Sequence, residues 1–257
     1  MNKIIVTSKQ DKFGSFEIHE NDSRNHRPLI SVVMSAFNNE KSIKESVESI
    51  LGQSFSDFEF IVIDDHSSDS TPDRLEEFLA KDERFALVRN NVNLGLTKSL
   101  IRGINISRGE LIARQDADDY SATDRLKEQL KFMPAFDLVC CRTQVNGKKI
   151  SPKWVSTVFY RYLLLSRNVF VHGSFLFKKK LYETLGGYDP FFSFAQDYDF
   201  IARVVNFPFK VKYLRDVLYF SRKSEESISI QFLKQQNEFA GKVKKSYLRD
   251  MFTKSKG

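Results

Sequence analysis

Three carboxylates lie within four positions of the chain, at Asp116, Asp118 and Asp119. They follow residues 110–113, a short apolar run typical of a strand, so this strand is expected to end in acid. One residue separates Asp116 from Asp118, and both carboxylates can point to the same side of the backbone. Such a pair suits a hard divalent cation, Mg²⁺ or Mn²⁺, that also binds phosphate and water. The alternative is an acidic turn that opens the next helix.

A second acidic group, Asp64 and Asp65, follows another strand pattern. Up to Asp119 the chain alternates strand and helix patterns, which predicts successive right-handed βαβ units and an α/β fold with a mainly parallel sheet. The strands are expected at residues 29–34, 58–63, 85–88 and 110–113. Because the ends of parallel strands lie at one edge of a sheet, both acidic groups are expected where open α/β sheets bind ligands.

Four further residues are candidates for this edge. Asp65 is placed to accept a hydrogen bond from a base or a ribose, and Phe37, after the first strand, is placed to stack on the base. Arg114 and Arg222 are candidate phosphate partners. An arginine in either position can equally pair with the aspartates.

Two candidates come from the second half of the chain. Asp197 lies at the start of a helix predicted from residue 196, and a carboxylate there can act as the general base for transfer to a hydroxyl. Its alternative role is to cap that helix. His172 begins a strand predicted at residues 172–177, where it is either a metal ligand or a structural histidine.

Composition narrows the class of protein. The 257 residues are 41% hydrophobic, enough for one large core, and 40 Lys and Arg against 33 Asp and Glu give a net charge of +7 that favours anionic partners. The 24 phenylalanines are better explained by core and acceptor-wall packing than by stacking on nucleic acid, so no nucleic-acid partner is expected. No run has signal-peptide or membrane-spanning character, so we expect a cytoplasmic protein.

The patterns suggest one continuous domain with two flanking segments. Residues 1–27 are polar and lack a clear period, which predicts a loosely attached extension whose histidines, His19 and His26, are solvated. Residues 28–229 form the domain, with a nucleotide half at 28–120 and an acceptor half at 121–229. In the acceptor half a strand pair is expected near residues 209–214 and 217–220. Residues 230–257 are expected to form a basic helix.

The motifs described above are also similar to those of a known protein family. Over about residues 28–229 the chain resembles the family-2 glycosyltransferases, inverting enzymes with the glycosyltransferase A fold. Each motif alone is weak, but their order and spacing are specific. The matching pieces are ISVVMSAFN at 30–38, SILGQS at 49–54, IDDHSSD at 63–69, NLGL at 93–96, GELIARQDADD at 109–119, DRL at 124–126, HGS at 172–174, GGYD at 186–189 and QDYD at 196–199.

The resemblance implies a role for each acidic residue. Asp65 would contact the uracil of a UDP-sugar, and Asp116 and Asp118 would form the DXD element, with Asp118 the principal ligand of Mn²⁺ or Mg²⁺. Asp197 would be the catalytic base of a single displacement that inverts the anomeric carbon. The implied acceptor is a saccharide or lipid-linked saccharide of bacterial surface-polysaccharide assembly.

Three positions depart from the family pattern. Gln196 stands where many members have Glu, and Phe37 stands where Tyr is common, which removes a hydroxyl but keeps a ring for stacking. Ser224 stands where a histidine is frequent, after the matching Arg222. A phosphate or metal contact from this part of the chain is therefore in question.

Two other classes compete with this interpretation. A sugar-phosphate nucleotidyltransferase also combines an α/β sheet, a metal and a nucleotide, but residues 35–41 lack the glycine-rich phosphate loop expected after its first strand. A non-catalytic basic module would bind membranes or nucleic acid through its charge. The lysines and apolar residues after residue 230 predict a helix that packs on the domain or lies on the inner face of the plasma membrane.

Overall fold

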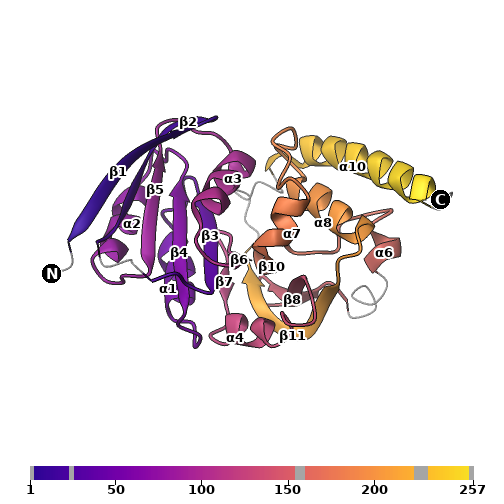
Figure 1. Ribbon diagram of the computed structural model, residues 1–257, viewed down its shortest axis with the longest axis horizontal. Coiled ribbons are helices and arrows are strands. Elements are labelled where there is room, and N and C mark those ends of the chain that lie inside the picture. The colour runs from indigo at the N-terminus through magenta and orange to yellow at the C-terminus, as the bar shows by residue number, and fades with distance from the viewer. Residues whose placement is uncertain (1–2, 23–25, 154–159, 223–230, 255–257) are drawn as a thin grey trace.

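One mixed β-sheet runs through the whole protein (Figure 1). The computed structural model describes residues 3–22, 26–153, 160–222 and 231–254. The strand order is β1-β2-β5-β4-β3-β6-β10-β8-β11-β7, with β9 paired to β8. Because β6 and β10 pair across the middle of this order, the two expected halves share one sheet.

The nucleotide half is a parallel sheet between helices. Its strands pair in parallel, and their apolar side chains are buried on both faces. Helix α3 covers one face and helices α1 and α2 cover the other. The elements are β3 (Ile30–Ala36), α1 (Ile43–Leu51), β4 (Phe58–Asp64), α2 (Thr71–Leu79), β5 (Phe85–Asn90), α3 (Leu96–Ile106) and β6 (Leu111–Arg114), close to the predicted order.

The acceptor half continues the sheet with mixed pairing. Strand β10 is antiparallel to both β6 and β8, whereas β11 is parallel to β8. Helices α7 and α8 lie on this half (Figure 1). The elements are β7 (Tyr120–Ser121), α4 (Arg125–Leu130), β8 (Leu138–Val145), β9 (Lys149–Ser151), α6 (Tyr160–Leu163), η1 (His172–Ser174), β10 (Leu176–Lys178), α7 (Lys179–Thr184), α8 (Gln196–Asn206) and β11 (Val211–Ser221).

Two predicted elements of the acceptor half differ in the structure. The strand expected at residues 172–177 begins instead with the 3₁₀ turn η1, and only β10 is extended. The strand pair expected near residues 209–214 and 217–220 is the single strand β11, whose register against β8 shifts after Leu214. Residues 215 and 216 form a bulge within β11, so this charged pair does not mark a turn between two strands.

The N-terminal segment is a correction to the sequence analysis. Residues 1–27 were predicted to be a loosely attached extension, but β1 (Ile4–Asp11) and β2 (Gly14–Asn21) form a hairpin that pairs with β5. Phe16 and Ile18 on β2 are buried in the core. The histidine prediction holds for His26, whose side chain is 77% exposed, and is wrong for His19, at 14%. Hydrophobic alternation on β2 is the signal that the polar composition obscured.

A buried arginine fastens this hairpin to the domain. Arg102 on α3 is 1% exposed, and its guanidinium donates two hydrogen bonds to the carboxylate of Asp11, at 2.7 and 2.9 Å. It also lies 4.2 Å from the centroid of the Phe16 ring. Burying a guanidinium without an anionic partner costs free energy. The Asp11 carboxylate of the hairpin supplies the negative charge that Arg102 on α3 requires.

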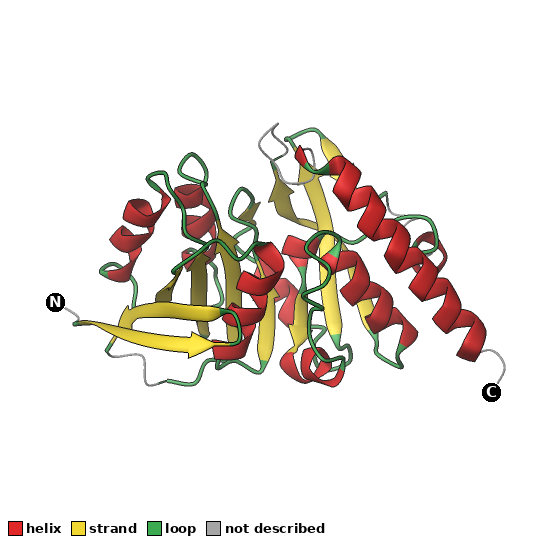
Figure 2. Ribbon diagram, turned by 90° about the horizontal axis from the view of Figure 1, so that it is seen from above, coloured by secondary structure: helices red, strands yellow, loops and turns green. Residues whose placement is uncertain are grey.

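The C-terminal helix α10 (Leu233–Lys254) packs along α8 on the outside of the acceptor half (Figure 2). Val243 and Tyr247 are its buried contacts. Within the ranges that the structure describes, no helix is both long enough and apolar enough to cross a membrane.

Removing the Asp11 carboxylate should destabilise the protein, because it leaves Arg102 buried with fewer acceptors. We expect Asp11→Ala to lower the free energy of unfolding by about 1–3 kcal/mol, the usual cost of unpairing a buried charged group. The measurement is denaturant unfolding. The control is Gln10→Ala, an exposed neighbour on the same strand, which should change stability by less than about 0.5 kcal/mol. Equal stability of the two variants would contradict an anchored hairpin.

Candidate functional site

Gln115 shapes the acidic loop that follows β6. Its side chain is fully buried, and Nε2 donates to the backbone carbonyls of Asp116 and Asp119 at 3.2 and 3.0 Å. Its Oε1 accepts a hydrogen bond from the Ser121 hydroxyl at 2.7 Å. The loop is therefore tied to a fixed amide at its centre. The role of Gln115 is not predicted from the sequence, because a single glutamine in a loop gives no signal of burial.

Arg114 is the residue beneath this loop. It is fully buried, and its guanidinium donates to the carbonyl of Val33 and, at 2.9 Å, to Oδ1 of Asp116. An arginine enclosed in this way does not present itself to a phosphate at the surface. The structure thus favours the alternative role, in which Arg114 pairs with an aspartate, over the predicted phosphate contact.

Tyr219 and Gly173 close the other side of Asp116. The buried Tyr219 hydroxyl accepts a hydrogen bond from the backbone N–H of Asp116 at 3.1 Å. A Cβ atom at Gly173 would lie 1.9 Å from that hydroxyl and 2.7 Å from Oδ2 of Asp116. Only a residue without a side chain fits there. The HGS motif therefore brings a bare backbone against the acidic loop.

Asp119 connects the loop to the end of β11. It is 5% exposed, and Oδ1 accepts the backbone N–H of Arg222 at 2.8 Å. Burial, together with the negative charges of Asp116 and Asp118, raises the pKa of Asp119 to about 8. The residue therefore joins two segments that are distant in the sequence.

Arg222 and Phe37 lie at the rim of the same edge. The guanidinium of Arg222 pairs with Glu45 and lies 5.1 Å from the centroid of the Tyr120 ring, beside the acidic loop. Phe37 follows β3 and is 47% exposed. Both side chains remain accessible for the phosphate and base contacts expected of them.

Asp65 does not have the free carboxylate that its predicted role requires. It is 1% exposed, and Oδ1 accepts from the amide of Asn90 and from the backbone N–H of Leu94, at 2.6 and 2.9 Å. Its Oδ2 accepts the N–H of Gly95 at 2.8 Å. The carboxylate thus holds the turn that enters α3. This geometry argues against direct contact between Asp65 and a base or ribose.

Asp197 lies in the first turn of α8 and is held by Asn168. The amide nitrogen of Asn168 donates to Oδ2 of Asp197 at 2.7 Å, while its amide oxygen accepts the N–H of Phe170 at 2.9 Å. That second bond fixes which end of the amide faces Asp197. Burial and the charge of Asp116 raise the pKa of Asp197 to about 6, while hydrogen bonds from backbone N–H groups and from Asn168 oppose the shift.

Two contacts lead from the acidic loop toward Asp197: Gly173 packs against Asp116, and the adjacent His172 contacts the Tyr188 hydroxyl. Asp116, in the loop after β6, and Asp197, in the first turn of α8, are 81 positions apart, yet the charge of Asp116 contributes to the raised pKa of Asp197. Burial and, with it, the charges of both aspartates raise the pKa of the Tyr188 hydroxyl. Asn168 was missed by the sequence analysis, since nothing in its neighbourhood indicates a partner 29 residues away.

His172 has a structural environment. It is 8% exposed, its Nε2 lies 2.6 Å from the Tyr188 hydroxyl, and its ring packs edge-on against Phe175. Burial holds the pKa of His172 well below its usual value. The contact with Tyr188 occupies Nε2, so the structure favours the structural alternative over a metal ligand.

Asp116 and Asp118, the remaining acidic pair, suit a metal ion that is also bound by phosphate oxygens of a ligand. Among the described residues, no group of three or more His, Cys, Asp or Glu side chains is arranged to hold an ion. Asp116 keeps 29% of its side chain exposed, and Asp118 is also half-buried. Two carboxylates with hard oxygens match the way Mg²⁺ binds through one or two carboxylates plus substrate phosphates. Asp116 and Asp118 are the residues that would hold it.

Comparison with known proteins gives the family. The family model described as "Glycosyl transferase family 2" matches residues 31–199, which include every motif from β3 to the first turn of α8. An uncharacterized glycosyltransferase of Methanocaldococcus jannaschii is 33% identical over 203 residues, which are 75% of this chain and 70% of the relative. WcaA of Escherichia coli, described as a candidate colanic acid biosynthesis glycosyl transferase, is 28% identical over 76% of this chain and 73% of the relative.

Solved structures share the fold. Staphylococcus aureus TarS in complex with UDP-GlcNAc superposes with a TM-score of 0.67 at 21% identity, over 77% of this chain and 59% of that chain. The mannosyltransferase PcManGT of Pyrobaculum calidifontis, with GDP-Man and Mn²⁺, gives 0.65 at 20%, over 82% and 61%. This chain thus spans about 60% of each. The α/β sheet with an acidic edge is that of the glycosyltransferase A fold, and the chain belongs to glycosyl transferase family 2.

Two glycine substitutions should have opposite effects on stability. Gly173→Ala places a methyl group against Tyr219 and Asp116 and should cost about 1–3 kcal/mol through overpacking. Gly241→Ala, in α10 with no atom within 4 Å of the added Cβ, should stabilise by about 0.5–1 kcal/mol through helix propensity. Denaturant unfolding measures both. A neutral Gly173→Ala variant would show that the acidic loop is not closely packed.

Proposed function

We propose that the protein is an inverting, metal-assisted glycosyltransferase that moves a sugar from a nucleotide-sugar, specifically a UDP-sugar, to a hydroxyl of a saccharide or lipid-linked saccharide. The observation that carries the proposal is the acidic loop after β6, which packs on Gly173, together with the Asp197 carboxylate that Asn168 holds in the first turn of α8. A diphosphate-binding carboxylate pair and a carboxylate base are the two parts that such a displacement needs.

The names of related proteins support the choice of substrates. TarS is described in complex with UDP-GlcNAc, and PcManGT with GDP-Man and Mn²⁺, so donors of the nucleoside diphosphate class occur on this fold. WcaA is described in terms of colanic acid biosynthesis. We therefore place this protein in surface-polysaccharide biosynthesis, with Mn²⁺ or Mg²⁺ as its metal.

The reaction would be a single displacement. Asp197 removes the proton from the acceptor hydroxyl as its oxygen attacks the anomeric carbon, and the bond from that carbon to the diphosphate oxygen breaks on the opposite face. The products are the glycoside, with inverted configuration, and the nucleoside diphosphate. A bound divalent cation would supply charge neutralisation for the leaving diphosphate. Phe37 would stack on the base, and Arg222 would contact phosphate after leaving Glu45.

Asn168 would position the base for this step. Its amide donates a hydrogen bond to Oδ2 of Asp197 and so holds the carboxylate in the first turn of α8. It also stabilises the charged form of the carboxylate, so Asp197 is ready to accept a proton near neutral pH. Asp119, Gln115 and Tyr219 keep the acidic loop in place without contacting substrate themselves.

We also propose a peripheral location at the cytoplasmic face of the membrane, where a lipid-linked acceptor is found. Phe232 and Leu233 are 38% and 58% exposed at the start of α10, and Phe191 is 59% exposed beside it. Lys242 lies over the Phe191 and Phe239 rings, so apolar and cationic groups share this surface. Flotation with anionic liposomes, with and without residues 230–257, tests the idea; equal flotation would refute it.

Changing the two key carboxylates should separate binding from chemistry. Asp118→Asn should abolish the Mn²⁺-dependent part of donor binding in a calorimetric screen of UDP-sugars, with EDTA as the metal-free reference. Asp197→Asn should bind the donor normally but turn it over about 10²–10⁴-fold more slowly, because the base is lost. Asp73→Asn, an exposed carboxylate on α2, is the matched control. Metal-independent binding unaffected by Asp118→Asn would overturn the site.

The rate should follow the protonation of Asp197. Because a general base must be deprotonated and the pKa is raised to about 6, kcat should be level above pH 7 and fall as pH drops through 6, by about tenfold at pH 5. Asn168→Ala removes a bond that stabilises the carboxylate, so its fall should begin at higher pH. Asn91→Ala, an exposed asparagine with no contact to Asn168 or Asp197 among the hydrogen bonds of the described residues, should leave the profile unchanged. An unmoved profile in Asn168→Ala would exclude a positioning role.

A further inference from the structure

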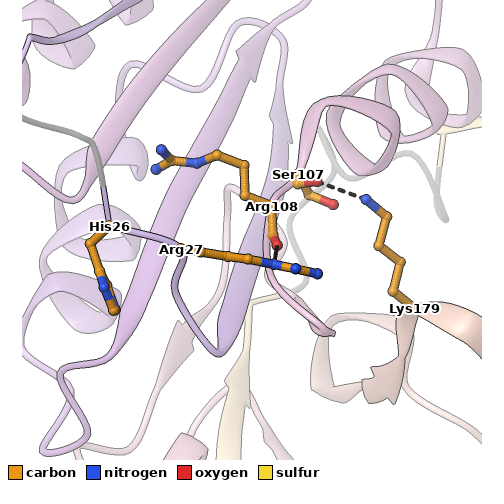
Figure 3. A pocket seen from close by; sticks show the side chains of 5 residues that line it. All are labelled: His26, Arg27, Ser107, Arg108 and Lys179. Carbon is orange, nitrogen blue, oxygen red and sulfur yellow. Dashed lines mark hydrogen bonds between the residues drawn. The ribbon is translucent and has the colours of Figure 1, made fainter.

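A cationic hollow lies at the sheet edge opposite the proposed donor site. It has a volume of about 390 Å³ and is lined by His26, Arg27, Ser107, Arg108 and Lys179 (Figure 3). None of these residues belongs to the acidic edge. Strand β3 alone is seven residues long, which separates the two edges by about 20 Å.

Sheet register brings these cations together. Arg27 comes just before β3, Arg108 just before β6, and Lys179 just after β10. In the sheet Ile30 pairs with Leu111, and Leu111 pairs with Lys178. Three segments that are far apart in the sequence therefore lie side by side where their strands start or end. Each contributes a positive charge at this end of the sheet.

Two of the positive charges meet only neutral partners. The Nε of Arg27 donates to the carbonyl of Arg108 at 3.2 Å, and Nζ of Lys179 donates to the carbonyl of Ser107 at 2.7 Å (Figure 3). A carbonyl accepts a hydrogen bond but does not cancel a charge. Among the described residues, no carboxylate is paired with either Arg27 or Lys179. Donor groups of both side chains remain for a further acceptor.

Two carboxylates beside the hollow already have cationic partners. Glu59 is 2% exposed and accepts bonds from Arg108, through its backbone N–H and Nε, and from the Ser31 hydroxyl. Asp57 lies 2.8 Å from Nε2 of His26. Glu59 thus balances Arg108 inside the protein, and the surface of the hollow keeps the charges of Arg27 and Lys179.

We propose that this hollow binds a phosphate group, distinct from the diphosphate of the donor. The planar guanidinium of Arg27 and the ammonium of Lys179 suit the several oxygens of a phosphate monoester or diphosphate. The volume is at the lower end of ligand pockets, which fits a phosphate-bearing head group rather than a whole nucleotide-sugar. The phosphate belongs to a soluble anion or to an anionic lipid, and these share the same chemistry.

The test is binding of pyrophosphate to the full chain by calorimetry in EDTA, which silences a metal-dependent donor site. We expect saturable binding that Arg27→Gln and Lys179→Gln each weaken about tenfold, a loss of about 1.4 kcal/mol. Lys127→Gln, an exposed lysine on α4 with the same charge change, should bind as the wild type does. Unfolding midpoints of all variants verify that they are folded.

A second arm separates the two sources of phosphate. Flotation with vesicles of phosphatidylcholine, with and without phosphatidic acid, should depend on Arg27 and Lys179 if the group is a lipid head group. Pyrophosphate binding without such flotation assigns the site to a soluble anion. Either result supports the phosphate site. Absence of both would overturn the proposal. So would pyrophosphate binding that Arg27→Gln and Lys179→Gln leave unchanged, or that Lys127→Gln weakens as much as they do.

Discussion

The ion pair between Arg114 and Asp116 is the constraint on which the candidate site depends. A guanidinium without solvent contact must find acceptors, and here they are the Val33 carbonyl on β3 and one oxygen of Asp116. The pair therefore fixes the acidic loop against the sheet. It also leaves the second oxygen of Asp116, facing Gly173, and the half-buried Asp118 to determine what the edge can bind.

Around this pair, ordered hydrogen-bonding groups of the protein, rather than solvent, hold the acidic loop. Gln115 holds the carbonyls of the loop, Tyr219 accepts the N–H of Asp116, and Asp119 accepts the N–H of Arg222. Asp197 is held in the same manner by Asn168. Preorganised groups of this kind do not have to reorient when charge moves during a reaction, which is the physical benefit of the arrangement.

The two edges of the sheet carry opposite charge. Carboxylates gather where the parallel strands end, and Arg27, Arg108 and Lys179 gather where β3 and β6 begin. The net charge of +7 is therefore not spread evenly over the surface. The hairpin of β1 and β2 adds a third feature, since it lengthens the sheet beyond β5 and supplies the charge that Arg102 needs.

The sequence by itself determined the strands of the nucleotide half, the acid that ends them and the family, because apolar runs and short motifs are local. Only the tertiary structure decided which of the candidate polar side chains are available to a ligand and which are occupied by other residues of the protein. It assigned Asp65 to the turn before α3, Arg114 to Asp116 and His172 to Tyr188, three partners that burial selects and spacing does not reveal. Asn168 beside Asp197, and the cationic hollow, arise from contacts between segments that only strand register and packing bring together.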